Sequence, residues 1–400
     1  MTRPRVFFYV QHLLGIGHLR RAAAITRALE RHGLTVAFVA GGEPVRGLDL
    51  GGADLVQLPP ARAGDSGFGS IVDDTGRPID DAWRHRRRSA LLAAFERWAP
   101  EAVLIELYPF GRRPFRFELR PLLEAAVARR PRPAIVCSVR DILVSRNDPQ
   151  RTAEIVDIIN HRFDLVLVHG DPRLIEFGAT FAGANAIGRQ LRYTGYVVGE
   201  PPAPGESRIG AGEILVSAGG GAVGAPLLRA AIGARPLTRV ADQPWRLIAG
   251  PNLPERDFRD LAASVRPNVT LERFRADFQT LLRNCRLSVS QAGYNTIMEL
   301  LAAGTRAVVV PFAEGGETEQ PVRARLLADR GLLTVVDPLA LTPESLAAGI
   351  DAADRGVRPA VSLDMSGADG TARAIIDAIA RRERDHDWST SLPIGGGHRS

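Results

Sequence analysis

A histidine that closes the first glycine-rich turn is the first candidate for chemistry. Gly15-Ile16-Gly17-His18 follows the apolar segment 6–10 and precedes a helical pattern. A histidine at a helix N-terminus resists protonation, because the helix dipole disfavours its cationic form, so it is suited to accept a proton. His18 is therefore a candidate general base for a hydroxyl nucleophile, and Gly15 and Gly17 let a substrate approach the backbone. Its position alone leaves a helix-capping or buried structural histidine as the alternative.

A second glycine-rich turn, Gly219-Gly220-Gly221, follows the apolar residues 214–216. Free backbone N–H groups at a turn between a strand and a following helix favour an anionic ligand, so this turn could bind a diphosphate. A flexible connector is the alternative. Two such units predict two nucleotide-binding-type domains that face each other across a cleft.

The most informative stretch is 288–304, SVSQAGYNTIMELLAAG. A strand is expected to end at Ser290, Gly293 to form a sharp turn, and a helix to begin near Asn295 and Thr296, with free N–H groups directed at the cleft. Glu299, one turn further on, could bind the two hydroxyls of a ribose. A capped helix beside a solvated loop is the alternative.

Two further groups of polar residues follow predicted strands. Glu319 and Gln320 open a helix after the polar loop 313–318 and would face the same ligand, since sugar hydroxyls need acceptors and an amide. Glu106 and Asp141 follow strands at 102–106 and 133–138, so we expect them on the acceptor side. Neighbouring arginines could instead pair with both.

The order of these motifs resembles the GT-B glycosyltransferases, most closely family 28, the branch that contains the MurG N-acetylglucosaminyltransferases. The resemblance is specific over 270–324 and looser in the N-terminal half, where 11–21 is similar to a subgroup of bacterial predicted glycosyltransferases. It implies that Glu299 binds the ribose of UDP and that His18 is a base or an acceptor-binding group. The other implied donor contacts are the diphosphate-binding residues Gly219, Gly220, Gly221, Gly293, Asn295 and Thr296, and the backbone of Phe274 and Arg275 beside the uracil.

The chain departs from the family at the residues that would contact the sugar. Glu319-Gln320 stands where two adjacent glutamines are typical, Arg323 replaces an asparagine, and the loop before them is longer. The resemblance therefore does not imply N-acetylglucosamine as the sugar.

These residues predict a glycosyltransferase that moves a sugar from a nucleoside diphosphate sugar, UDP-linked by the resemblance, to a hydroxyl of a small-molecule, glycan or lipid acceptor. No cofactor is expected. The resemblance implies inversion at the sugar. We expect a metal-independent reaction, because the sole metal-like spacing, Asp385-His386-Asp387, falls in a predicted tail. The alternatives are a nucleotide-sugar hydrolase or 2-epimerase on the same fold, and a non-catalytic protein that binds sugar nucleotides.

Short continuous apolar runs alternate with helical patterns, which predicts an α/β chain with two doubly wound, Rossmann-like domains of the GT-B type. We expect an acceptor domain over 1–198, a linker over 199–212, a donor domain over 213–382, with packing of its last helix back on the N-terminal domain as an option, and a disordered tail over 383–400. The expected N-terminal strands are 5–10, 35–40, 54–58, 102–106, 133–138 and 164–169, with helices at 18–32, 82–98, 115–130, 150–161 and 171–178. The expected C-terminal strands are 213–217, 245–249, 269–272, 286–290, 306–310 and 333–336, with helices at 223–234, 256–264, 277–284, 293–303, 319–330, 343–354 and 367–382. Segment 62–80 reads as a mobile loop.

Composition excludes several classes of protein. All 51 basic residues are arginine, and this excludes Schiff-base chemistry and a lysine-bearing P-loop. The basic cluster within 84–88 lacks aromatic platforms, so we predict a solvated face and no nucleic-acid binding. No run of 18 apolar residues and no signal-peptide pattern occurs, so we expect a cytoplasmic protein, with peripheral membrane contact as an option. Cys137 and Cys285 are expected to be buried thiols.

Overall fold

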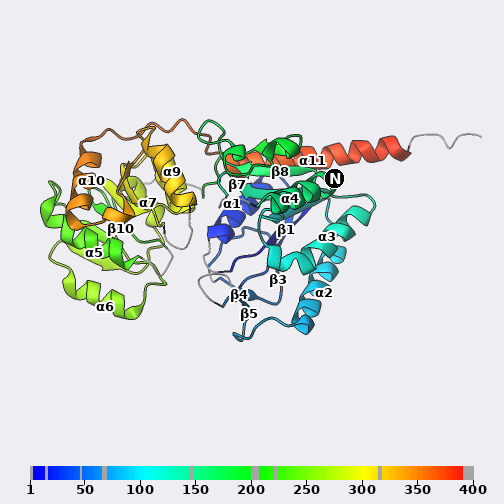
Figure 1. The fold of residues 1–400 in the computed structure, drawn as a ribbon, viewed down its shortest axis with the longest axis horizontal. Coiled ribbons are helices and arrows are strands. Elements are labelled where there is room, and N and C mark those ends of the chain that lie inside the picture. The colour runs from blue at the N-terminus through cyan, green and yellow to red at the C-terminus, as the bar shows by residue number, and fades with distance from the viewer. Residues whose placement is uncertain are drawn as a thin grey trace, which may run out of the picture.

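The structure, a computed structural model, describes residues 3–13, 17–45, 47–64, 70–143, 148–199, 207–219, 224–313 and 318–390, with only the backbone over 385–390. These residues form two α/β domains, each built on one parallel sheet (Figure 1). The predicted pair of doubly wound domains is confirmed.

The N-terminal sheet has seven strands in the order β3-β2-β1-β6-β7-β8-β9. The strands are β1 (Arg5–Val10), β2 (Thr35–Ala40), β3 (Asp54–Gln57), β6 (Ala102–Glu106), β7 (Ala134–Arg140), β8 (Leu165–His169) and β9 (Leu191–Tyr193). The helices are α1 (Gly17–Arg31), α2 (Asp81–Trp98), α3 (Arg116–Ala128) and α4 (Pro149–Arg162), with short 3₁₀ turns at Arg113–Phe115, Phe177–Ala179 and Ala184–Ile187. The strand order reverses between β1 and β6, and ligands bind at such a switch point in open α/β sheets.

The C-terminal sheet has six strands in the order β12-β11-β10-β13-β14-β15. The strands are β10 (Ile214–Ser217), β11 (Trp245–Ile248), β12 (Val269–Glu272), β13 (Leu287–Gln291), β14 (Ala307–Val310) and β15 (Thr334–Val335). The helices are α5 (Ala225–Ala234), α6 (Glu255–Ser264), α7 (Phe278–Asn284), α8 (Tyr294–Ala303), α9 (Glu319–Ala328), α10 (Pro343–Arg355) and α11 (Gly367–Thr390), with 3₁₀ turns at Arg235–Leu237 and Pro338–Ala340. The switch point here lies between β10 and β13.

Strand β1 shows why each sheet is covered on both faces. Alternate residues of a strand point to opposite faces. Phe7 and Tyr9 join one apolar cluster with α2 and α3, whereas Val6, Phe8 and Val10 join another with α1 and α11. All five are fully buried. A continuous apolar run is therefore the pattern of a strand with helices on both sides.

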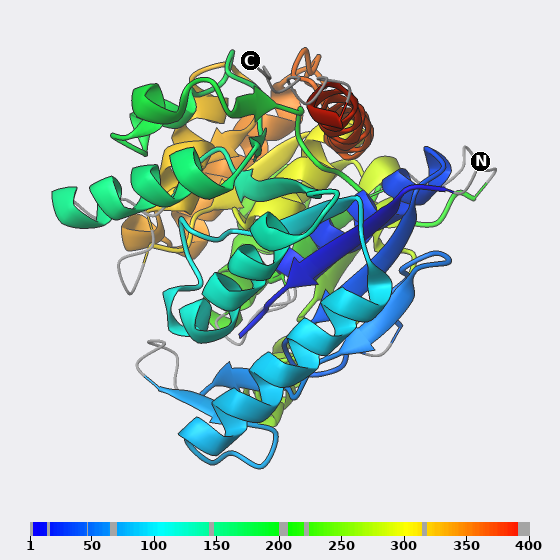
Figure 2. The same cartoon turned by 90° about the vertical axis from the view of Figure 1, so that its right-hand side faces the viewer.

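The last helix, α11, belongs to the C-terminal half in sequence but packs on the N-terminal domain. Ala372, Ile375 and Ile379 join the cluster that contains Leu19 and Ile25 of α1. Figure 2 shows α11, in red, beside the N-terminal sheet. The chain therefore crosses between the domains twice.

The expected start of a disordered tail at Glu383 is wrong, because α11 continues to Thr390. Residues 383–390 contain neither glycine nor proline, and charged residues are compatible with an exposed helix. The expected linker 199–212 falls partly outside the described residues, which omit 200–206.

Three other expectations need correction. Residues 171–178 form turns that lead into the 3₁₀ helix Phe177–Ala179 instead of an α-helix, and the side chain of Asp171 accepts the backbone N–H groups of Arg173 and Asp364, so it ties this turn to the segment before α11. Within the predicted loop 62–80, the described part contains an antiparallel hairpin, β4 (Ala61–Ala63) with β5 (Ile71–Asp73). Strands of three residues are too short to give a periodic signal.

The third correction concerns Arg87, in the basic cluster for which we predicted a solvated face. Arg87 is fully buried and its Nε donates to Glu118 at 2.8 Å, while its guanidinium lies over the rings of Trp83 and Phe115. A helix pattern alone does not reveal a partner 31 residues away.

None of the described helices is both long and apolar enough to cross a bilayer. Both cysteines are free and buried, as predicted.

Candidate functional site

The site is built around His18, the second residue of α1. Strand β1 leads into α1, and β6, its neighbour across the switch point, ends at Glu106. His18 Nδ1 lies 2.6 Å from Glu106 Oε1. A carboxylate only accepts hydrogen bonds, so Nδ1 carries the proton and Nε2 presents the lone pair. The two residues, predicted separately, thus form a histidine–carboxylate pair.

Burial sets the charge of His18, and neighbouring positive groups set that of Glu106. It lowers the pKa of His18 to about 3, a shift that Glu106 opposes and Arg140 and Arg112 reinforce. Burial would raise the pKa of Glu106, but its contacts with His18, Arg112 and Arg21 outweigh this and hold that pKa well below its usual range. Near neutral pH the pair is therefore a neutral imidazole on an ionised carboxylate, the state that a general base requires.

Two arginines support Glu106 from the N-terminal domain. Arg21, one turn along α1 from His18, donates from Nη2 to Oε1 at 2.7 Å. Arg112 donates from Nη2 to Oε2 at 3.1 Å. The side chain of Glu106 is only 1% exposed, so these contacts compensate the cost of burying a carboxylate.

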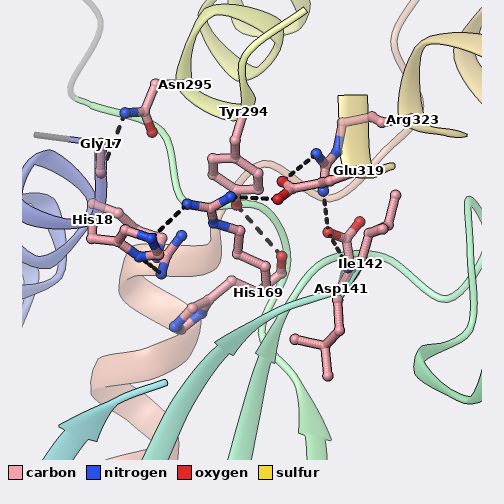
Figure 3. Close-up of polar contacts among 12 residues, drawn as sticks. Gly17, His18, Asp141, Ile142, His169, Tyr294, Asn295, Glu319 and Arg323 are labelled. Atoms are coloured by element: carbon pink, nitrogen blue, oxygen red, sulfur yellow. Dashed lines mark hydrogen bonds and ion pairs between the residues drawn. The ribbon is translucent and has the colours of Figure 1, made fainter. Parts of the chain in front are cut away.

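Arg140 connects this pair to the other domain. Its Nη2 donates to His18 Nε2 at 3.0 Å, and its Nη1 donates to Glu319 Oε2 at 2.5 Å. Glu319 is the first residue of α9, and burial, which raises its pKa, is outweighed by Arg140 and Arg323, which lower it to about 2. Figure 3 shows this line of contacts from His18 to Glu319.

A second ion pair across the domains continues the line. Arg323 donates to Glu319 Oε1 and to Asp141 Oδ1, both at 2.6 Å, and Tyr196 donates its hydroxyl to Asp141 Oδ2 at 2.7 Å. Arg323 and Asp141 are fully buried. Asp141, predicted on the acceptor side, is thus bonded within the domain interface. Arg323, the departure from the family noted above, is its partner.

Tyr294, the first residue of α8, lies at the centre of these charges. The guanidinium carbons of Arg21, Arg140 and Arg323 lie 5.5, 5.4 and 4.9 Å from its ring centroid. Its hydroxyl donates to the backbone oxygen of His169 at 3.4 Å. We call the network of ion pairs that includes these three arginines the interdomain arginine cluster; it comprises Arg21, Arg112, Arg140 and Arg323 with Glu106, Asp141 and Glu319.

Three of the predicted donor residues, Gly293, Asn295 and Thr296, lie at the N-terminus of α8. Gly293 is the N-cap, and no side chain caps the first turn, so its N–H groups remain available. A Cβ at Gly293 would meet no atom within 4 Å, and the same holds for Gly219, whose φ is +72°. Asn295 donates to the backbone oxygen of Gly17 at 3.3 Å and so joins the donor helix to the turn before His18. Thr296 follows it, partly exposed.

Two other predicted donor residues, Glu299 and Gln320, already have hydrogen-bond partners within the protein. Glu299 is half-buried, and desolvation raises its pKa, while Arg20 and a hydrogen bond with Gln279 act in the opposite direction. Gln320 accepts the backbone N–H of Phe312 at 3.1 Å.

Phe274 and Arg275, which we predicted to lie beside the uracil, follow β12. Phe274 is 60% exposed and offers a ring face. The guanidinium of Arg275 donates hydrogen bonds to the carboxylates of Asp277 and Glu272. Gly15, Gly220 and Gly221 lie outside the described residues.

No group of histidine, cysteine, aspartate or glutamate side chains within the described ranges is arranged to hold a metal ion. The positive charge at the site comes instead from the interdomain arginine cluster and the N-terminus of α8.

Sequence reasoning missed the roles of Arg21, Arg140, Arg323 and Tyr294. For Arg323 one signal was available, because Glu319 and Arg323 are four residues apart, the spacing of a helical ion pair. Arg140 ends β7 at the carboxyl edge of the sheet, where ligands bind. Their contacts depend on how the domains meet, which no local pattern encodes.

A known protein family matches part of the C-terminal domain. Residues 215–358 match the glycosyltransferase family 28 C-terminal domain. The UDP-N-acetylglucosamine--N-acetylmuramyl-(pentapeptide) pyrophosphoryl-undecaprenol N-acetylglucosamine transferase of Xanthomonas oryzae pv. oryzae (strain MAFF 311018) is 33% identical over 172 residues, 41% of this chain and 37% of that protein. The chain thus spans about a third of the length of the curated relatives it matches.

Solved structures show the fold over nearly the whole chain. The calicheamicin glycosyltransferase CalG4 has a TM-score of 0.58 at 17% identity, covering 98% of both chains. MurG of Acinetobacter baumannii has a TM-score of 0.53 at 15% identity, covering 97% of this chain and all of that one. The predicted GT-B fold is therefore confirmed, as is the resemblance of the C-terminal domain to family 28.

Proposed function

With a family 28 C-terminal domain on a GT-B fold as the premise, we propose that the chain is a glycosyltransferase. It moves a sugar from a nucleoside diphosphate sugar, UDP-linked, to an acceptor hydroxyl. The observation that carries the proposal is the neutral His18 held by Glu106 at 2.6 Å, directly across the domain interface from the first residues of α8 and α9. A base on one domain and an anion-binding helix end on the other are what group transfer between two substrates needs.

In the proposed reaction, the acceptor hydroxyl gives its proton to Nε2 of His18 while its oxygen bonds to the anomeric carbon. The bond from that carbon to the diphosphate oxygen breaks, and the electron pair leaves with the diphosphate. A single displacement of this kind inverts the anomeric centre. Glu106 keeps the proton on Nδ1 and stabilises the imidazolium that forms.

The departing diphosphate gains negative charge at the N-terminus of α8. Free N–H groups of Tyr294, Asn295 and Thr296, together with the guanidinium groups around Tyr294, supply fixed positive charge there. We therefore propose that transfer proceeds without a metal ion. Glu299 binds the ribose, and Phe274 with Arg275 borders the base.

The acceptor belongs to one of three classes in this proposal: a small molecule, a glycan or a lipid-linked sugar. The Xanthomonas relative acts on an undecaprenol-linked substrate by its name, and a lipid-linked acceptor would place this chain at the cytoplasmic face of a membrane. Nucleic acid is not a partner in the proposal.

The proposal is tested by donor turnover with His18→Ala and Glu106→Gln. Each purified variant is incubated with UDP-sugars and a mixture of acceptors, and released UDP is measured. We expect kcat to fall about 100-fold or more in both variants with little change in the KM for the donor, because the base acts in the transition state. Glu124→Gln, an exposed glutamate on α3, serves as the control. Full turnover in His18→Ala would overturn the assignment of the base.

A further inference from the structure

Nε2 of His18, which must accept the proton in the proposed reaction, already accepts a hydrogen bond from Arg140. Glu106 binds Nδ1 of His18, so the one lone pair of the neutral ring is on Nε2, and Arg140 Nη2 donates to it at 3.0 Å. One lone pair cannot accept the guanidinium and a hydroxyl proton at the same time. Arg140 must leave His18 before transfer can occur.

The surroundings of Arg140 indicate where it goes. Its guanidinium spans the domains, with Glu319 on the far side and the ring of Tyr294 at 5.4 Å. Tyr294 is the first residue of α8, so Arg140 already lies beside the proposed diphosphate site. Its Nε is buried and has no hydrogen-bond partner among the described residues. Arg140 therefore keeps one donor, its Nε–H, that none of these contacts uses.

The interdomain arginine cluster carries a net positive charge. The cluster holds four guanidinium groups and three carboxylates, and His18 is neutral, which leaves one positive charge in excess. The side chains of Arg21 and Arg323 are at most 1% exposed, that of Arg112 is 10% exposed and that of Arg140 is 19% exposed, so water compensates this charge only in part. A diphosphate at the N-terminus of α8 would supply the compensating charge.

We propose that Arg140 is a catalytic residue that caps His18 in the free protein and transfers to the donor's diphosphate when the donor binds. This inference rests on the proposed function and deepens it. Donor binding exposes the base, so the acceptor hydroxyl is activated only when a donor is present. During displacement Arg140 then holds the oxygen to which the electron pair of the breaking bond goes.

The first test observes His18 directly in the wild-type protein. With histidine labelled with ¹⁵N, and the His18 signal assigned from its loss in His18→Ala, Nε2 is followed as UDP is added. We expect the Nε2 resonance to move toward that of a nitrogen without a hydrogen-bond donor, and UMP and uridine to leave it nearly unchanged. An Nε2 resonance that stays constant while UDP saturates the protein would overturn the proposal.

The second test measures UDP, UMP and uridine affinities by calorimetry for the wild type, Arg140→Lys and Arg140→Met. We expect Arg140→Met to lose about tenfold or more in UDP affinity while uridine affinity is kept, since charge-assisted hydrogen bonds are the strong ones. Arg140→Lys should fall between. Arg120→Met, which removes an ion pair with Glu154 in which both side chains are exposed, is the matched control.

The possible outcomes separate the two proposals. If Arg140→Met binds UDP as the wild type does, Arg140 is only an ion pair between the domains, and the proposed function still stands. If the wild type binds no nucleoside diphosphate, both proposals fail. Misfolding of Arg140→Met would leave the resonance measurement on the wild type to decide.

Discussion

At the scale of single residues, the sequence identified several residues of the site but not their contacts with one another. His18, Glu106 and Glu319 were predicted from their positions after glycine turns and strands. The contact between His18 and Glu106 joins residues 88 apart, and that between Arg140 and Glu319 joins residues 179 apart. Such pairings depend on strand order and domain closure, so local spacing identifies the groups but not their partners.

A buried histidine gives a residue-scale prediction about pH. His169 accepts or donates at 2.7 Å to Ser138 and at 2.9 Å to Thr194, and burial, reinforced by Arg21, lowers its pKa to about 3. The unfolded chain binds this proton near pH 6.5, whereas the folded chain does not. The free energy of unfolding should therefore be highest above pH 6.5 and decrease as the pH falls toward 3.

His169→Gln removes the contribution of His169 to this dependence, while that of His18 remains. Between pH 6 and pH 5, the slope of unfolding free energy against pH, measured by urea denaturation, should be shallower than in the wild type by about 1.4 kcal/mol per pH unit. His161→Gln, whose side chain is 71% exposed, is the control and should keep the wild-type slope. Equal slopes in wild type and His169→Gln would show that His169 takes up its proton in the folded protein.

At the scale of elements, long periodic segments were predicted well and short ones were not. The strands at both switch points and the helix that begins at Tyr294 lie where the apolar runs placed them. The hairpin of β4 and β5, and the turns at 171–178, were missed because three-residue strands and Asp171-centred turns leave no periodic signal. The donor site was predictable because it depends on one strand, one glycine and one helix start.

The exposed backbone at Gly293 gives a prediction at this scale. A Cβ there meets no protein atom within 4 Å and φ is −60°, so Gly293→Ala should fold with unchanged thermal stability. The added methyl group would lie where a diphosphate approaches the first turn of α8. We expect calorimetry to show UDP binding weakened about tenfold, with uridine binding kept.

Gly178→Ala is the matched control, because its Cβ would make an ordinary contact of 3.6 Å with Ala184, far from the site in sequence. Unchanged UDP affinity in Gly293→Ala would mean that the diphosphate does not approach this turn.

At the scale of the whole molecule, buried ion pairs and apolar contacts hold the domains together. Arg323 of α9 bonds to Asp141 of the N-terminal domain with neither side chain exposed, and Leu174 and Tyr196 join the apolar cluster of α8. Helix α11 adds a second connection by packing on α1. The relative position of the domains is therefore built into the fold and sets the geometry of the site.

Asp141→Asn should destabilise the protein strongly. Removing one partner of a buried pair leaves Arg323 with excess charge, and such changes cost about 3 kcal/mol or more. Asp81→Asn, which breaks the pair of the 96%-exposed Asp81 with Arg84, should cost less than about 1 kcal/mol. Urea denaturation followed by tryptophan fluorescence compares the two. Equal effects would mean that the buried pair does not stabilise the interface.

The measurement that tests the central claim most directly is a calorimetric titration of the purified protein with nucleoside diphosphates and their sugars. The account predicts selective binding of UDP and one UDP-sugar, weakened about tenfold in Glu299→Ala and unchanged in Glu344→Ala, an exposed glutamate on α10. Absence of binding to every nucleotide, or equal affinities in both variants, would contradict a UDP-sugar donor site in the C-terminal domain.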